Sequence, residues 1–164
     1  VSMTNITTAA NAEFAIGTTA DIDTSSDSAA ITDFQNDTYQ VVGDVESIPS
    51  FGDEINPVNF TGLTDQRTKK FKGSRDAGTI DLTVAFNVDD QGQVDLKAAL
   101  DDETQDDYNF RVTINDGTSG GSNTVLYFFG KVMSRSVEIS SVDNIVRATV
   151  QVGINSAIYQ VDGS

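Results

Sequence analysis

Alternation between hydrophobic and polar positions is the most regular pattern in this chain. Between residues 79 and 86 the sequence reads TIDLTVAF, so that every second position is apolar: Ile80, Leu82, Val84 and Phe86. Because successive side chains of a strand point to opposite faces of a sheet, this period of two predicts a β-strand with one buried face. Weaker alternation predicts further strands over residues 13–19, 38–48, 58–63, 108–114, 124–132, 135–139 and 144–152, and a short one over residues 157–161.

Helical spacing occurs in one segment, residues 93–100. Its apolar side chains recur at helical intervals: Val94, Leu96, Ala98, Ala99 and Leu100. Residues 20–37 are rich in Asp, Ser and Thr and are expected to form a loop. One helix among about eight strands predicts a single domain over residues 1–164, a β-sandwich or barrel that carries one helix. The other polar stretches are expected to be a mobile N-terminal arm (1–11), an acidic loop (101–107), a Gly-rich hairpin linker (115–123) and a C-terminal tail (155–164).

Candidate chemistry is sparse in this sequence. The chain has no Cys and no His, which removes disulfides, thiolate metal sites and the side chain most often used as a general base near neutral pH. The acidic run over residues 101–107 suits a hard cation by composition, but a solvated loop after a helix explains it as well. Asp21, Asp23 and Asp27 resemble the start of a calcium loop. However, Ser26 and Thr32 stand where a calcium loop needs its glycine and its closing glutamate. We therefore predict no catalytic residue, no metal site and no cofactor, and no apolar run is long enough to span a membrane.

Charge is divided unevenly along the chain. The formal net charge is −15, yet five of the ten Lys and Arg residues fall between Arg67 and Arg75. This basic patch lies in the polar segment 49–76, which is predicted to be a long loop that docks onto another copy of the chain. A flexible solvated loop is the alternative, and the overall charge argues against RNA or membrane contact. The residues assigned to this assembly loop are Arg67, Lys69, Lys70, Lys72, Arg75 and Asp76.

A series of short motifs carries a resemblance to a known family. In order they are VESIP (45–49), KGSRDAG (72–78), DQGQ (90–93), KAAL (97–100), YNFRV (108–112), FFGKV (128–132) and RATVQV (147–152). Each motif alone is an ordinary strand or turn. Their order and spacing over about residues 39–159 resemble the major tail tube proteins of long, non-contractile bacteriophage tails of the lambda type.

The resemblance implies a fold, an assembly and a set of partners. The fold would be a two-sheet β-sandwich, a partly open barrel, with one flanking α-helix. Subunits would form hexameric rings in which four strands from each subunit join into one barrel around a lumen. Stacked rings would form the tail tube, a conduit for DNA during ejection. The partners would be further copies of the chain, tail initiator or baseplate and terminator proteins, and a tape measure protein followed by DNA in the lumen, with no cofactor and no membrane.

The resemblance also places the protein in the virion tail, and in the host cytoplasm during assembly. Its barrel strands map onto residues 38–48, 55–63, 132–140 and 144–153, where one face is apolar and the other polar. An ordinary sheet facing solvent produces the same alternation. The polar side chains expected to face the lumen are Asp44, Glu46, Asn59, Thr61, Ser134, Ser136, Glu138, Arg147, Thr149 and Gln151. Arg147 stands out as a cation in this set, and Glu138 is its expected partner.

Three other functions compete with the tail tube of a non-contractile phage. The inner tube of a contractile tail or secretion-type machine would share the fold and the hexamer. A carbohydrate-binding β-sandwich would use surface aromatics, for which Tyr39, Tyr108 and Tyr159 are candidates, but the chain has no Trp. A hydrolase built on paired carboxylates is the least supported of the three. For the tube subunit we expect a free protein that is monomeric or weakly associated, with segment 49–76 and both chain ends disordered until a ring forms.

Overall fold

In the computed structural model, which describes residues 7–117 and 120–164, the chain forms ten strands and two helices. In chain order these are β1 (Glu13–Ile16), α1 (Asp27–Asn36), β2 (Gln40–Val42), β3 (Val45–Ser47), β4 (Glu54–Thr61), β5 (Thr68–Asp76), β6 (Thr79–Ala85), α2 (Gln91–Asp101), β7 (Tyr108–Ile114), β8 (Thr124–Glu138), β9 (Arg147–Ile154) and β10 (Tyr159–Val161). The predicted mainly β fold is confirmed. Residues 1–6 of the predicted N-terminal arm, and residues 118–119 of the predicted linker, lie outside the described residues.

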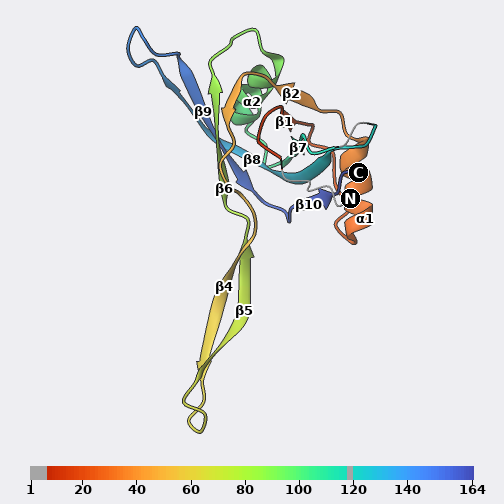
Figure 1. Cartoon of the computed structure of the whole chain (residues 1–164), viewed down its shortest axis with the longest axis vertical. Helices are drawn as coiled ribbons and strands as arrows, with labels where there is room; N and C mark the ends of the chain where they lie inside the picture. The colour runs from red at the N-terminus through yellow and green to blue at the C-terminus, as the bar shows by residue number, and fades with distance from the viewer. Residues whose placement is uncertain (1–6, 118–119) are drawn as a thin grey trace.

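Strand β8 joins the two parts of the main sheet. The hydrogen-bonded order is β2-β1-β7-β8-β9-β6-β3, and β10 also pairs with β8. The first half of β8, up to Gly130, pairs with β7, and its second half, from Gly130 to Glu138, pairs with β9. The end strands of this order, β2 and β3, are consecutive pieces of one chain segment. The sheet therefore curls round and nearly closes into a barrel, from which the ribbon β4–β5 projects along the long axis of the molecule (Figure 1).

A corner at Gly43 and Asp44 separates β2 from β3. Asp44 has a positive φ of 58°, a left-handed conformation that Asp tolerates better than most residues. Its carboxylate accepts a hydrogen bond from the Asn87 side chain at 3.0 Å, and its carbonyl accepts one from the Ala85 N–H at 2.8 Å. The single strand predicted over residues 38–48 is therefore wrong, because the chain leaves β1 at this corner and pairs with β6 instead.

The two strands predicted over residues 124–132 and 135–139 are one continuous strand, β8. Its register against β9 shifts between Val132 and Ser134. A bulge of this kind adds one residue and reverses the side-chain alternation. The sequence pattern therefore breaks at Met133 although the strand does not.

One hydrophobic core fills the inside of the curled sheet. The rings of Phe14, Phe110 and Phe128 meet at its centre, with ring centroids 5.3 Å apart for Phe110 and Phe128 and 5.7 Å apart for Phe14 and Phe110. Strands β6 and β9 each alternate between buried and more exposed side chains, which confirms the strand predicted over residues 79–86. Their buried side chains are Ile80, Leu82, Val84, Ala148, Val150, Val152 and Ile154.

The predicted helix is confirmed as the longer α2, and two polar side chains hold its first turn. The Asp90 carboxylate caps the helix by accepting hydrogen bonds from the N–H groups of Gln93 and Gly43, each at 3.0 Å. The buried Gln93 side chain donates in turn to the carbonyls of Gly43 and Ala85. These bonds connect the start of α2 to the corner between β2 and β3.

The segment predicted as a loop over residues 20–37 contains a second helix, α1, so the prediction of one helix is wrong. Ser26 caps it by accepting a backbone hydrogen bond within the first turn. Of its ten residues, Ala30 and Phe34 are buried, so the segment lacks the broad apolar stripe from which helices are recognised. Phe34 packs in an aromatic cluster outside the barrel, with its ring centroid 5.5 Å from that of Tyr127.

Asp37 ties the end of α1 to the body. Its carboxylate accepts hydrogen bonds from the N–H and hydroxyl of Thr18, at 2.9 and 2.6 Å, and from the side chain of the buried Asn109 at 2.9 Å. Burial alone would raise the pKa of Asp37, but the hydrogen bonds from Thr18, Asn109 and Thr38 outweigh it and hold this pKa below its ordinary value.

Most of the polar segment 49–76, predicted as a long loop with one short strand over residues 58–63, folds into the antiparallel ribbon β4–β5. The pairing begins beside the turn, with Thr61 opposite Thr68, and becomes irregular next to Pro57. Strand β5 reads TKKFKGSRD, with charged side chains on both of its faces. It therefore lacks the alternation that reveals a half-buried strand.

Candidate functional site

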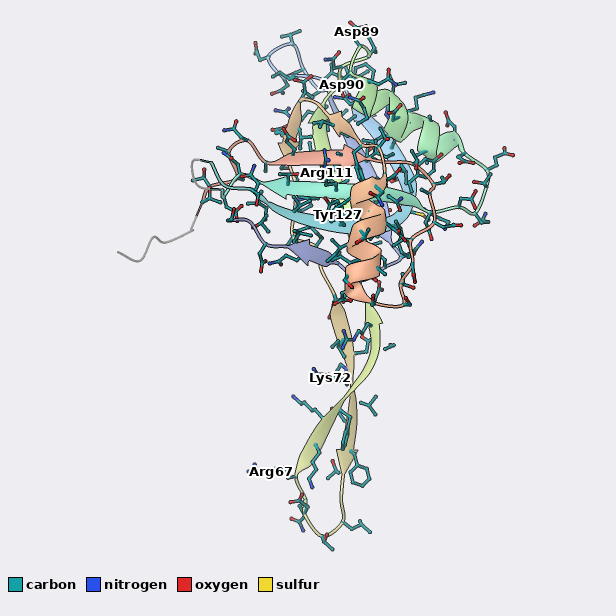
Figure 2. All side chains as sticks on the ribbon, turned by 90° about the vertical axis from the view of Figure 1, so that its right-hand side faces the viewer. Arg67, Lys72, Asp89, Asp90, Arg111 and Tyr127 are labelled. Atoms are coloured by element: carbon teal, nitrogen blue, oxygen red, sulfur yellow. The ribbon has the colours of Figure 1, made fainter. Side chains whose placement is uncertain are left out.

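The ribbon β4–β5 and its turn, residues 54–76, form an arm that stands clear of the main sheet. The arm is a separate two-stranded sheet. Lys72 lies along it and Arg67 lies close to its tip, whereas Asp89 and Asp90 lie at the opposite end of the molecule (Figure 2). All five residues of the predicted basic patch are thus carried on the arm. Asp76 lies at its base, where its carboxylate accepts a hydrogen bond from the Gly78 N–H at 2.8 Å and shapes the turn into β6.

The two faces of the arm differ in chemistry. Val58 lies opposite Phe71, and Phe60 is on the same face, whereas Lys70 and Lys72 lie on the other face. The side chains of Val58, Phe60 and Phe71 are 55%, 59% and 57% exposed. A two-stranded ribbon alone is marginally stable in water, and large apolar side chains on it add to that cost. This face is therefore suited to burial against another surface.

Charge separates the arm from the rest of the chain. Residues 57–75 contain five cationic side chains and one acidic one, Asp65, so this part carries a net charge of +4. Since the whole chain carries −15, the rest of it carries −19. Lys69 forms an exposed ion pair with Asp65, with 3.1 Å between Nζ and Oδ2. Within the described residues, Lys70 and Lys72 form no ion pair. The arm is therefore a cationic projection on an anionic body.

A polar surface covers the outer face of the strands β3, β6, β9 and the second half of β8. Residues directly opposite in an antiparallel pair share a face, and the register forms two such rows across these strands. The first row is Ser136, Thr149, Thr83 and Ser47, and the second is Ser134, Gln151 and Asp81. The opposite face of β6 and β9 lines the core, together with Val45 of β3 and Val132 of β8. We call this surface the polar wall.

The structure brings together most of the residues predicted to face a lumen, but not all of them. Residues Ser134, Ser136, Glu138, Arg147, Thr149, Gln151 and Glu46 lie on the polar wall. Asp44 lies at the corner beside it. Asn59 and Thr61 lie on the arm, because the expected barrel strand over residues 55–63 pairs with β5 rather than with the main sheet.

Strand β6 takes the place expected for that barrel strand, between β9 and β3. Asp81 and Thr83 therefore belong to the polar wall, although strand 79–86 was not among the four expected barrel strands. The signal was present in the sequence, since both residues lie on the polar face of the alternating strand. What the alternation could not show was which strands are neighbours.

Arg147 is paired, but with a different carboxylate from the one expected. Its Nε donates to Glu46 of β3, and the two side chains form an ion pair. Glu138 lies opposite Arg147 in the register of β8 and β9. The hydrogen bond and charge of Glu46, and then the charge of Glu138, raise the pKa of the Arg147 guanidinium. One cation is thus held between two carboxylates, and the polar wall remains net anionic.

Both sides of the polar wall end in strand edges. The sheet order ends at β3, which pairs with β6 in the described part of the chain. On the other side, the pairing of β7 with β8 stops at Gly130. Residues 131–138 of β8 therefore pair with β9 on one side and have no β7 partner on the other. Unpaired N–H and C=O groups at such edges can pair with another chain. The wall can therefore be extended from both sides.

The tyrosines considered for sugar binding are used in packing. The guanidinium of Arg111 lies 4.9 Å from the Tyr39 ring centroid, and burial, followed by the charge of Asp37, raises the pKa of Tyr39. The Tyr108 hydroxyl donates to Asp102 at 2.8 Å, and its pKa is raised to about 12 by burial and then by this bond. Tyr159 packs against the aromatic cluster at α1.

Two further features of the described ranges bear on function. No group of three or more carboxylates in them is placed to hold a metal ion. Neither helix of the described chain is both long enough and apolar enough to cross a membrane.

Comparison with known proteins gives a match of fold. No protein-family model and no curated protein sequence matches the chain. Among solved structures, it is similar to the SPP1 tail tube (10% identity, TM-score 0.61, covering 92% of this chain and 76% of that one). It is also similar to a chain of the anti-feeding prophage baseplate (7% identity, TM-score 0.67, covering 98% of this chain and 98% of that one). A third similar chain comes from the PVC sheath/tube terminator of an extracellular contractile injection system (9% identity, TM-score 0.65, covering 95% of this chain and 96% of that one). The chain therefore has the fold of tail tube proteins, as its motifs predicted.

Proposed function

We propose that this chain is a structural tube subunit, with no catalytic role, that forms hexameric rings stacked as the tail tube of a phage. The observation that supports this most directly is the polar wall. It is a sheet with a packed core on one face, polar and net anionic side chains on the other, and unpaired edges on both sides. In a ring, such edges join neighbouring subunits into one continuous barrel, and joining them removes the exposed edges.

The lumen of this ring is lined by the polar wall. Its Glu46, Glu138 and Asp81 carboxylates outnumber the cation Arg147, which is itself paired. Lys131, on the same face of β8, is neutralised by its ion pair with Asp107. A net anionic lining repels a polyanion at close range, so DNA passes without binding. Asp44 joins the lining at the corner. Asn59 and Thr61 lie on the arm, on the face that also carries Lys70 and Lys72, so we assign them to the contact between subunits and not to the lining.

The arm serves assembly through two properties. Its apolar face gains from being covered, and its cationic side chains complement the anionic body of another copy. Arg67, Lys69, Lys70, Lys72 and Arg75 supply this charge, and Asp76 sets the direction in which the arm leaves the body. The arm is thus part of the contact between subunits.

The inner tube of a contractile machine is the second candidate. Two of the similar structures come from contractile systems, and their TM-scores of 0.67 and 0.65 are no lower than the 0.61 for the SPP1 tail tube. Both candidates are structural tube subunits. In either case the further partners are proteins that initiate and terminate the tube and a tape measure protein in its lumen, in a virion tail assembled in the host cytoplasm.

Electron microscopy tests the proposal. The concentrated protein is examined in negative stain, with light scattering on the same sample. We expect six-fold rings or hollow tubes in the images and a rise in scattering with concentration. If no rings or tubes form at any concentration, even after addition of the initiator complex of the same tail, the chain is not a self-assembling tube subunit.

A further inference from the structure

An apolar groove lies at the end of the molecule opposite the tip of the arm. It has a volume of about 270 Å³, and its lining comes from the end of β6, the loop into α2, the first turns of α2 and the second half of β8. Asp89 and Asp90, next to the lining residues in sequence, mark this end in Figure 2, where Arg67 marks the other. The residues lining the groove are Phe86, Asn87, Val88, Gln93, Val94, Lys97 and Arg135. Three of them, Phe86, Val88 and Val94, are exposed large apolar side chains.

Leu63 at the tip of the arm is the counterpart of this groove. Its side chain is 99% exposed. The turn that presents it is ordered by a hydrogen bond from the Gln66 N–H to the Gly62 carbonyl at 3.1 Å. A leucine held out at the end of a projecting ribbon does nothing for the stability of its own chain. It has the position and chemistry of an anchor residue that fills a pocket on a partner.

The charges at the two surfaces also match. Asp65 is the single acidic residue between positions 57 and 75, and it lies two residues from Leu63. At the rim of the groove, Lys97 is paired with Asp101 of its own helix. Arg135, whose guanidinium lies 5.4 Å from the Phe86 ring centroid, forms no ion pair among the described residues and is the cation that the groove offers to a partner. At longer range, the cationic arm approaches an anionic body. Attraction therefore operates both at the tip and along the arm.

We propose that the groove of one copy receives Leu63 from the arm tip of a second copy, with Asp65 of the second copy facing Arg135 of the first. This inference rests on the proposed tube function and names the contact that joins successive rings. Because the tip and the groove lie at opposite ends of one chain, the contact is head to tail and repeats without closing on itself. The arm tip of each subunit contacts the ring on one side, and its groove receives an arm tip from the ring on the other side.

Cysteine cross-linking tests this contact cleanly, because the chain has no native Cys. A disulfide requires Cα atoms within about 7 Å of each other. In Leu63→Cys/Val88→Cys every subunit carries both halves of the contact, so oxidation of assembled tubes is expected to give a covalent ladder on denaturing gels. A mixture of the two single variants is expected to stop at dimers. The matched control is Leu63→Cys/Val142→Cys, since Val142 is also 99% exposed and lies in the turn between β8 and β9.

Each outcome decides the proposal. A ladder with Val88→Cys but not with Val142→Cys supports it. Tubes that form without a ladder, or a ladder with the Val142 pair, alone or together with the Val88 pair, overturn the groove as receiver and leave the tube function standing. If the wild-type protein forms no rings or tubes, the tube function fails and the inference fails with it.

A second variant keeps the test independent of cysteine chemistry. Leu63→Asp changes a side chain that is exposed in the free subunit, so circular dichroism should show an unchanged fold. We expect the concentration needed for assembly to rise by about tenfold or more, because one buried leucine side chain is lost from every contact. Leu63→Met retains an apolar side chain and should assemble like the wild type. Normal assembly of Leu63→Asp would overturn the proposal.

Discussion

Asp90 is the point at which the fold behind the polar wall can be tested quantitatively. Asp90→Ala removes two hydrogen bonds of 3.0 Å, one that caps α2 and one that holds the Gly43 N–H at the corner before β3. Losing a helix cap costs about 1 kcal/mol, and a hydrogen bond to a charged acceptor contributes about 1.5–3 kcal/mol. Because the carboxylate is only partly buried, we take the lower part of this range. We expect the free energy of unfolding to fall by about 2–3 kcal/mol.

Urea unfolding of the dilute protein measures this loss, followed by circular dichroism and by tyrosine fluorescence, since the chain has no Trp. For a domain of this size each kcal/mol corresponds to about 2–4 °C in Tm, so Asp90→Ala should melt about 5–10 °C lower. Asp90→Asn is the matched control, because both bonds are accepted by the same Asp90 oxygen and an amide oxygen can replace it without the charge, and it should lose about 1 kcal/mol. An Asp90→Ala variant within about 0.5 kcal/mol of the wild type would refute the reasoning, since surface substitutions without a structural role fall in that range.

Three further results are expected. Lys69→Glu/Lys70→Glu should fold normally by circular dichroism and form no tubes, whereas the charge-conserving Lys69→Arg/Lys70→Arg should form them. Normal tubes from the Glu variant would show that the charge of the arm is not needed for assembly. Hydrogen exchange across residues 66–74 should be fast in the dilute protein and slow after assembly, and strong protection in the dilute protein would contradict an arm that depends on a partner. The pKa of Asp37 is lower in the folded chain than in the unfolded one, so its contribution to stability is present above about pH 4 and is lost as the pH falls through the folded value. Urea unfolding between pH 5 and about pH 2.5 should therefore show a smaller acid-induced loss for Asp37→Asn than for the exposed control Asp143→Asn, and equal losses would exclude this role.

The parts of the fold that could be predicted are those in which one face of an element is buried and the other is not. Strand β6 could be read from the sequence because Ile80, Leu82 and Val84 are all buried and the residues between them are polar or more exposed. Elements without that contrast were missed. Helix α1 buries Ala30 and Phe34 alone, and β5 has both faces exposed, so their sequences carry no period to detect.

The parts of the candidate site that could not be predicted depend on register and on neighbours. The alternation in β9 correctly placed Arg147, Thr149 and Gln151 on one face. It could not show that Arg147 pairs with Glu46, which lies 101 residues away. That contact exists because the chain turns at Asp44 and brings β3 beside β6, and a corner made by one left-handed residue leaves no periodic signal. Local pattern fixes the face of a residue, whereas tertiary structure fixes its partner.

In the proposed tube, the uneven charge of the chain reconciles the passage of DNA with self-assembly. A lining that does not hold DNA has to be anionic, but identical anionic subunits repel one another. Confining +4 to the arm, against −19 elsewhere, supplies attraction at one directed contact while leaving the polar wall negative. A contact between an arm at one end and a body surface at the other is heterologous, and such a contact repeats without closure. Nothing in it sets a length, so a tube built in this way requires a separate component to stop its growth, which is the part that a tape measure protein and a terminator would play.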